Sequence, residues 1–220
     1  MRKYYTRPCN FYYGNYAKYL ITNKKALSLA GNPNIAFDQI EILQRKKKGI
    51  TQSNIYPITK IKVLNKEIKS KVEIDLKKIT LKRKSICGIQ FDRPQIMGVL
   101  NITPDSFSDG DLFFDESKAY EQANLMIKHG AKIIDIGGES TRPGSKVIEE
   151  NNEWNRIEKT IIKLKKKFSK IPLSLDTRKS NIMKKGIECG VSFINDVSGL
   201  NFDKKSFKII NSKNIPFILH

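Results

Sequence analysis

The sequence has few of the features that mark secreted, disulfide-rich or membrane-spanning proteins. Its 220 residues include three cysteines (Cys9, Cys87 and Cys189), an odd and scattered set with no Cys-x-x-Cys pair, which excludes a disulfide framework or a four-cysteine zinc site. No window approaches the roughly 18 consecutive apolar residues of a membrane-spanning helix. The basic N-terminus is not followed by the apolar segment of a secretion signal. We therefore expect a cytoplasmic protein with reduced thiols and no membrane association.

Acidic residues are also scarce, since 22 Asp and Glu stand against 41 Lys and Arg, giving a net charge of +19. Residues 1–90 hold 20 basic and 5 acidic side chains, whereas residues 91–220 hold 21 and 17. Such a basic region can attract nucleic acid by releasing counterions. The basic runs lack the interleaved aromatic residues that stack on bases, and Lys outnumbers Arg 33 to 8, as A-rich codon usage would produce. We therefore do not expect nucleic acid as a partner.

The chain changes character between residues 85 and 90. Before this point, residues 58–64 and 72–81 alternate apolar and polar side chains, a period that predicts half-buried strands. We interpret residues 1–85 as a basic N-terminal extension of unknown role. We interpret residues 86–220 as a second domain, because they are less basic than residues 1–85 and show a different arrangement of apolar residues.

Short apolar runs alternate with helical patterns from residue 95 onwards. Glycines follow two of the helical segments, as is common at helix C-termini. The alternation of strand and helix is typical of a parallel sheet. Strands are predicted at residues 96–100, 133–136, 171–175, 191–194 and 215–219, and helices at 117–129, 150–168, 179–189 and 203–212.

Polar residues follow the predicted strands at their carboxyl ends. They are Asn101, Asp135 and the following glycines, Asp176, Asn195 with Asp196, and His220. Because the loops after parallel strands converge on one face of an α/β barrel, these groups predict a site there. Two loops, 103–110 and 139–145, are rich in hydroxyls, Gly and Pro and suit a phosphate or diphosphate, whereas Asp and Asn side chains suit a heterocycle with N–H donors. Neither loop contains a nucleotide P-loop or dinucleotide fingerprint.

Four segments together resemble the dihydropteroate synthase family. They read MGVLNITPDSFSDG at 97–110, DIGGESTRPG at 135–144, LDT at 175–177 and INDVS at 194–198. The resemblance covers residues 86–220 and leaves 1–85 outside. It implies a TIM-type (β/α)8 barrel. It also implies a transferase of folate biosynthesis that condenses 6-hydroxymethyl-7,8-dihydropterin diphosphate with 4-aminobenzoate and releases diphosphate, assisted by Mg²⁺.

The resemblance also implies roles for individual residues in catalysis. Asn101 would ligate Mg²⁺ and approach the diphosphate. Thr141 and Arg142 would contact phosphate oxygens or order the second loop. Glu139, in the same loop, is interpreted as structural.

Five further residues are expected to bind the two substrates. Asp176 and Asn195 would hydrogen-bond the edge of the pterin. Ser106, Phe107 and Pro143 would form the aminobenzoate pocket when both loops close. Loop closure would exclude water from the reactive pterin methylene.

The expected barrel is incomplete, because only five strands are predicted and eight are needed for closure. The family's later motifs have no counterpart, so we expect a C-terminally truncated, inactive fragment that lacks part of the active site. Two alternatives stay open: a pterin-binding methyltransferase module, which would not need both loops, and a basic, non-enzymatic binding protein acting through residues 1–90. The role of His220, the sulfonamide sensitivity and a homodimer of the full-length protein are left open.

Overall fold

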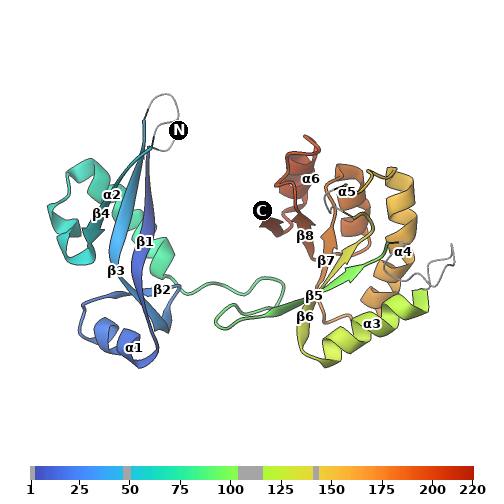
Figure 1. Ribbon diagram of the computed structural model, residues 1–220, viewed down its shortest axis with the longest axis horizontal. Helices are drawn as coiled ribbons and strands as arrows, with labels where there is room; N and C mark the ends of the chain where they lie inside the picture. The colour runs from blue at the N-terminus through green and yellow to red at the C-terminus, as the bar shows by residue number, and fades with distance from the viewer. Residues whose placement is uncertain (1–2, 47–50, 104–115, 141–143) are drawn as a thin grey trace. The chain divides into compact units, whose positions relative to one another are not determined.

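The computed structural model describes residues 3–46, 51–103, 116–140 and 144–220. The chain divides into two compact units (Figure 1). The N-terminal unit comprises residues 1–85 and Gln90–Asp92, and the C-terminal unit comprises Ile86–Ile89 and Arg93–His220. Each unit has its own apolar core.

The N-terminal unit is an antiparallel sheet with helices. The long strand β3 pairs with β1 on one side and with β2 and β4 on the other. The strands are β1 (Tyr4–Tyr13), β2 (Leu27–Leu29), β3 (Asn32–Arg45) and β4 (Thr51–Pro57), and the helices are α1 (Gly14–Thr22), the 3-10 helix η2 (Ile58–Val63) and α2 (Lys66–Thr80).

The two strands predicted at 58–64 and 72–81 are wrong, because these residues form η2 and the second half of α2. The side chain of Asn65 caps α2 by accepting a hydrogen bond from the Ile68 backbone N–H at 2.9 Å. Val72, Leu76 and Ile79 then follow Ile68 at helical spacing and pack into the same core. Tertiary burial of this helical stripe outweighs the local alternation that favoured a strand.

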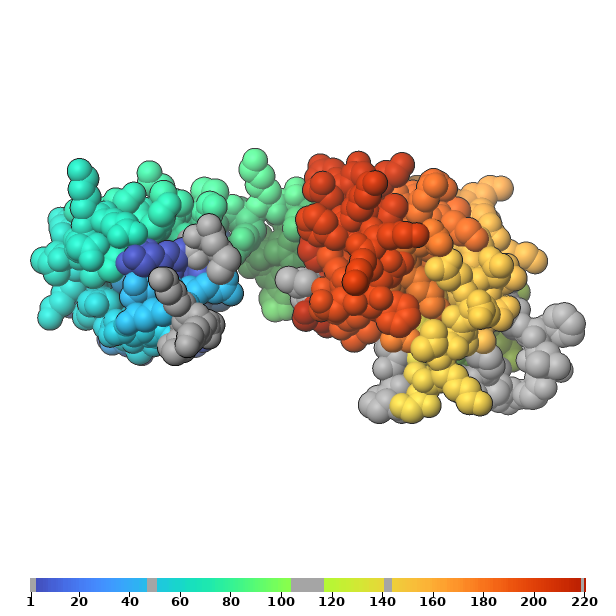
Figure 2. Space-filling model, turned by 90° about the horizontal axis from the view of Figure 1, so that it is seen from above, coloured from blue at the N-terminus to red at the C-terminus, as the bar shows by residue number. Residues whose placement is uncertain are grey.

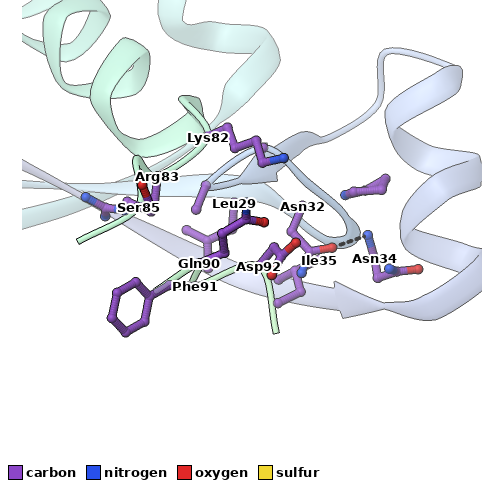
Figure 3. A pocket seen from close by; sticks show the side chains of 13 residues that line it. Leu29, Asn32, Asn34, Ile35, Lys82, Arg83, Ser85, Gln90, Phe91 and Asp92 are labelled. Carbon is purple, nitrogen blue, oxygen red and sulfur yellow. Dashed lines mark hydrogen bonds between the residues drawn. The ribbon is translucent and has the colours of Figure 1, made fainter. Parts of the chain in front are cut away.

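A cavity of about 550 Å³ lies within the N-terminal unit. Its walls are the turn between β2 and β3, residues Lys82, Arg83 and Ser85 after α2, and residues 90–92 (Figure 3). None of the residues with a predicted role lines this cavity. All residues with predicted roles belong to the C-terminal unit.

The C-terminal unit is a parallel sheet of five strands in the order β5-β6-β7-β8-β9. The predicted alternation of strands and helices is confirmed, with small shifts of the ends. The strands are β5 (Ile96–Asn101), β6 (Ala131–Gly137), β7 (Leu173–Asp176), β8 (Phe193–Asp196) and β9 (Phe217–Leu219), and the helices are α3 (Glu116–Lys128), α4 (Glu150–Lys167), α5 (Ser180–Glu188) and α6 (Ser206–Lys213).

The helices cover one face of this sheet. A row of four in-register residues, one from each of the strands β5 to β8, is at most 1% exposed and packs in the core with residues of α3 to α6: Leu100, Ile136, Leu175 and Ile194. The atoms of α5 and α6, orange and red in Figure 2, form part of the outer surface of the unit. None of the helices in the described part of the chain combines the length and apolar character of a membrane span.

A two-residue hairpin precedes β5 and packs against the sheet of the C-terminal unit. The residues at its ends, 86 and 89, exchange backbone hydrogen bonds of 2.9 and 3.0 Å. Cys87 and Gly88 between them have φ values of 50° and 79°, the left-handed pair that a tight hairpin turn requires. The last residue of the hairpin packs against Ile133 and Phe193, near the amino ends of β6 and β8.

Candidate functional site

A row of polar residues crosses the carboxyl edge of the parallel sheet. Asn101 pairs in register with Gly137, Gly137 with Asp176, and Asp176 with Asn195. Residues in register on neighbouring strands point to the same face. This face is opposite to the one that the helices cover. The structure therefore brings together three residues with predicted roles: Asn101, Asp176 and Asn195.

Gly137 keeps the middle of this row open. A Cβ atom on this residue would lie 3.4 Å from Oδ2 of Asp176 and 3.5 Å from Oδ1 of Asn101. The two side chains thus flank the space above a residue that has no side chain. A ligand atom can enter between an amide oxygen and a carboxylate oxygen there.

Asn195 is held in one orientation by a chain of hydrogen bonds. Its Nδ2 donates to Oδ2 of Asp135 at 2.8 Å. Nε2 of His220 lies 2.8 Å from the amide oxygen of Asn195, and because an amide oxygen only accepts, this ring nitrogen carries the proton and donates. Asn195 is 9% exposed. Both ends of its amide are therefore fixed before any ligand binds.

Burial and nearby carboxylates disfavour the ionisation of Asp176. The pKa of Asp176 is raised from 3.8 to about 7, chiefly by burial and then by the negative charges of Asp135, Glu153, Asp196 and Glu139. Burial also raises the pKa of Asp135. A ligand that brings N–H donors or positive charge to Asp176 would stabilise its carboxylate.

Asp196, the next residue after Asn195, is used to shape the loop after β8. Its Oδ1 accepts from the Ser198 N–H at 2.8 Å, and its Oδ2 accepts from the Leu200 N–H at 3.0 Å. It is 1% exposed. Asp196 therefore contributes to the site through its charge and through the shape of the loop.

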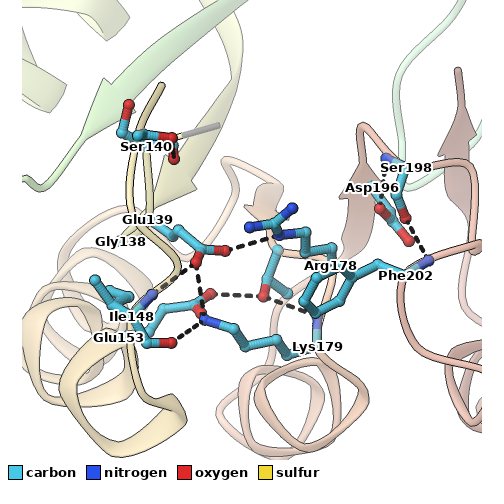
Figure 4. A network of polar contacts seen from close by, with 12 residues as sticks. Gly138, Glu139, Ser140, Ile148, Glu153, Arg178, Lys179, Asp196, Ser198 and Phe202 are labelled. Atoms are coloured by element: carbon cyan, nitrogen blue, oxygen red, sulfur yellow. Dashed lines mark hydrogen bonds and ion pairs between the residues drawn. The ribbon is translucent and has the colours of Figure 1, made fainter. Parts of the chain in front are cut away.

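A buried ion-pair cluster joins residues that follow β6 and β7 to α4 (Figure 4). Nζ of Lys179 is 3.1 Å from Oε1 of Glu139, 2.6 Å from Oε2 of Glu153 and 2.7 Å from the backbone oxygen of Ile148. Thr177 donates its hydroxyl to the other carboxylate oxygen of Glu153 at 2.6 Å. We call Glu139, Glu153, Thr177, Arg178 and Lys179 the Lys179 cluster.

Arg178 extends the cluster towards the loop after β8. Its Nε donates to Oε2 of Glu139 at 3.0 Å, and its guanidinium lies over the ring of Phe202, 4.1 Å from the centroid. Asp203, next in the chain, accepts from the Ser180 N–H at 2.9 Å and so caps α5. Burial would raise the pKa of Glu139, but its hydrogen bonds with Arg178, with the Ile148 N–H and with Lys179 hold it below its usual range.

Sequence reasoning missed Lys179 and Glu153. Glu153 precedes Ile157 by one helical turn and therefore lies on the core-facing stripe of α4. A carboxylate at such a position is rare unless it is paired with a cation. The position of Glu153 on the apolar stripe could have predicted a buried cationic partner, but it could not have identified Lys179 as that partner.

Five residues with predicted roles lie outside the described residues: Ser106, Phe107, Thr141, Arg142 and Pro143. The fit of the predicted Mg²⁺ can be judged at its expected ligand, Asn101. In the described part of the chain, no group of three or more His, Cys, Asp or Glu side chains could hold a metal ion. Mg²⁺ takes hard oxygen ligands, commonly one or two from the protein with the rest from water and substrate phosphates. The amide oxygen of Asn101 beside Gly137 fits that chemistry.

Comparison with known proteins identifies relatives of the C-terminal unit. Residues 97–220 match the family model described as pterin binding enzyme. The chain is 44% identical over 128 residues to the dihydropteroate synthase of Clostridium beijerinckii, covering 58% of this chain and 47% of the relative. It is 41% identical to that of Bacillus subtilis, again over 128 residues, with 58% and 45% covered. The chain thus spans about half the length of the curated relatives it matches.

Solved structures show the same likeness. A dihydropteroate synthase of Clostridium difficile, determined in the presence of pteroic acid, matches with a TM-score of 0.55 and 42% identity, covering 58% of this chain and 48% of the other. The Xanthomonas albilineans enzyme with 4-aminobenzoic acid matches with a TM-score of 0.56 and 35% identity, covering 60% and 47%. The five parallel strands therefore form part of a TIM-type barrel. On the family match, which takes in more than half of the chain, the protein belongs to the pterin binding enzymes.

Proposed function

We propose that the protein containing this chain is a dihydropteroate synthase, a transferase that joins 6-hydroxymethyl-7,8-dihydropterin diphosphate to 4-aminobenzoate and releases diphosphate. The observation that carries the proposal is the row of Asn101, Asp176 and Asn195 around the gap at Gly137. Curated relatives at 41–44% identity support it by their activity. We propose a cytoplasmic location as well, which agrees with the three free cysteines of the described residues.

The pterin end of the substrate is assigned to Asp176 and Asn195. A carboxylate accepts the N–H groups of a flat heterocycle, and an amide can both donate and accept. Asp135 and His220 fix the amide of Asn195 from both ends. The proposed role of Asn195 is therefore to present a preset hydrogen-bonding edge to the pterin.

The diphosphate end is assigned to Asn101, with Thr141 and Arg142 on the basis of the family resemblance. In the reaction, the bond from the pterin methylene to the diphosphate oxygen breaks and a bond to the aminobenzoate nitrogen forms, while that nitrogen loses a proton. Mg²⁺ held by Asn101 would neutralise charge on the departing diphosphate. Ser106, Phe107 and Pro143 are proposed to hold the aminobenzoate.

The direct test is formation of dihydropteroate by the complete protein expressed from its gene. Purified protein is mixed with both substrates and Mg²⁺, and the product and the released diphosphate are measured together. We expect both products in equal amounts. Diphosphate release without dihydropteroate, or no turnover of either substrate, would contradict the proposal.

Alanine at Gly137 should weaken ligand binding while leaving the fold stable. Its methyl group meets its neighbours at 3.4 Å or more, an ordinary contact, yet it fills the space between Asn101 and Asp176. Calorimetric titration with 6-hydroxymethylpterin and thermal unfolding measure the two properties. Gly138 is the matched control, because a Cβ there would lie 2.9 Å from the backbone oxygen of Glu153. Gly138→Ala should cost about 1–3 kcal/mol of stability through overpacking. Unchanged pterin affinity in Gly137→Ala would count against the assigned site.

Asp176 should make the protein less stable as the pH rises through neutrality. Its pKa is 3.8 as a free carboxyl and about 7 in the folded protein, so between these values the folded state binds more protons than the unfolded state. By linkage, its contribution to stability is fully present below the unfolded pKa and is lost as pH rises through the folded one. Asp176→Asn removes this loss.

Urea unfolding of Asp176→Asn and of the parent protein at about pH 5 and pH 8 tests this linkage. The stability of the variant relative to the parent should be greater at the higher pH. Glu139 and Asp203, whose pKa values are lowered, affect both proteins equally and cancel in the difference. A relative stability that is constant with pH would mean that Asp176 titrates normally.

A further inference from the structure

Lys179 follows Asp176 by three residues, and all donors of its ammonium group are engaged. An ammonium group has three N–H donors, and the Lys179 group has three acceptors within 3.1 Å, on Glu139, Glu153 and Ile148. The side chain is only 5% exposed. No donor is left for a substrate phosphate, so Lys179 cannot act by direct contact.

The charges of the cluster also balance one another. The carboxylates of Glu139 and Glu153 are matched by the cations of Arg178 and Lys179. Because these four charges sum to zero, the cluster does little to attract an anion from a distance, although its carboxylates act on the nearby Asp176. We therefore attribute its contribution to substrate binding to the positions of the segments that it joins.

Those segments are the ones that leave the carboxyl edge of the sheet. Glu139 follows β6, Lys179 follows β7, and Glu153 belongs to α4. Ile148, just before α4, donates its N–H to Oε1 of Glu139 at 3.1 Å and gives its backbone oxygen to Lys179. One lysine thus holds both ends of the segment from Glu139 to Ile148 against the end of β7.

Arg178 adds a third connection. It lies between Glu139 and the ring of Phe202 (Figure 4), which belongs to the loop after β8. The loops after three adjacent strands are therefore joined through two consecutive residues, 178 and 179. Asp176, a member of the polar row, lies two residues before Arg178.

We propose that Lys179 is a positioning residue of the proposed synthase, which holds Glu139 after β6 and Ile148 before α4 and so sets where Ser140 lies relative to Asn101 and Asp176. The inference rests on the proposed function, because that function places the diphosphate beside this segment. It assigns Lys179 no contact with substrate. It also gives Glu139 a defined structural role, as the acceptor shared by Lys179, Arg178 and Ile148.

The test compares two variants of the complete protein with a control. Lys179→Met removes the ammonium and leaves two buried carboxylates without their shared partner. The double variant Lys179→Met with Glu153→Gln removes one charge of each sign and so restores the balance. Lys184→Met changes an exposed lysine on α5, the helix that begins directly after Lys179, and serves as the control.

We expect the KM for dihydropterin diphosphate to rise about 10- to 100-fold in both Lys179 variants, as misplacement of a binding segment predicts. The KM should stay high in the charge-balanced variant even where its melting temperature recovers. The kcat per folded molecule, counted by active-site titration, should change less than the KM. Lys184→Met should behave as the parent protein does.

Each contrary result has a distinct meaning. A KM within about twofold of the parent value in either folded Lys179 variant overturns the inference, because a 1 Å misplacement should cost far more. Recovery of the parent KM in the charge-balanced variant also overturns it, since charge compensation would then suffice. If Lys179→Met does not fold, the charge-balanced variant carries the measurement. An inactive parent protein would instead refute the proposed synthase function.

Discussion

Alanine in place of Asp176 should lower the affinity for a pterin by roughly 1–3 kcal/mol for each N–H donor that loses its acceptor. In the described part of the chain, no hydrogen bond or ion pair engages the Asp176 carboxylate, and the charged groups that raise its pKa are other carboxylates. We therefore expect the Asp176 carboxylate to accept hydrogen bonds from a ligand. Calorimetric titration of the variant with 6-hydroxymethylpterin measures the loss.

Asp203→Ala is the matched control for this prediction. Asp203 is also a carboxylate near the carboxyl edge, but it caps α5 by accepting from the Ser180 N–H. Its removal should cost about 0.5–2 kcal/mol of stability and leave pterin affinity unchanged. Asp203 already caps α5, so the helix does not need Asp176 as a cap. Equal pterin affinity in Asp176→Ala and the parent would remove Asp176 from the site.

Leucine in place of Glu153 should destabilise the folded protein by about 3–5 kcal/mol, the cost of removing one partner from a buried ion pair. Glu153 is completely buried and accepts from Lys179 and Thr177, both at 2.6 Å. Without it the ammonium keeps Glu139, which it shares with Arg178. Urea unfolding followed by circular dichroism gives the free energy of unfolding.

Asn155→Leu controls for the added apolar side chain, since Asn155 is exposed on the same helix. A substitution there should change stability by no more than about 0.5 kcal/mol. A loss below about 1 kcal/mol in Glu153→Leu would show that the cluster relaxes or admits water at little cost, contrary to the expected penalty for a buried unpaired charge.

The parallel sheet could be predicted from the sequence because each buried strand is a short run of mostly apolar residues. Ile134 and Ile136 face the helices and Ile133 packs on the other side of the sheet, so the run has apolar residues on both faces, as strands covered on both faces do. Asp135 is the one polar residue in the run from Ile133 to Ile136. The polar residues Asn101, Asp176 and Asn195 stand at the strand ends, and register alone then aligns them. The parallel topology therefore brings these strand-end residues close together although they are far apart in the sequence.

The N-terminal unit was predicted poorly for a related reason. Its long strand β3 is held by pairing with β1 and β4, and these contacts leave no strong signal in the local sequence. Val72 and Leu76 fit both a strand and a helix pattern, and only packing against Phe37 and Ile40 decides between them. The Lys179 cluster was missed likewise, because Glu153 and Lys179 are distant in sequence and meet only after folding.

The course of the chain between the two units has a consequence for how the protein could be divided or recombined. Ile86–Ile89 belongs to the C-terminal unit, whereas Gln90–Asp92, which follows it, belongs to the N-terminal unit. The chain therefore passes from one unit to the other three times between residues 85 and 93, and no single cut yields two intact units. Cleavage after residue 92 would leave the sheet without the hairpin that packs on Ile133 and Phe193. Cleavage after residue 85 would deprive the N-terminal cavity of one wall. A chimera that exchanges the N-terminal unit between related genes would therefore have to take residues 86–92 from a single parent.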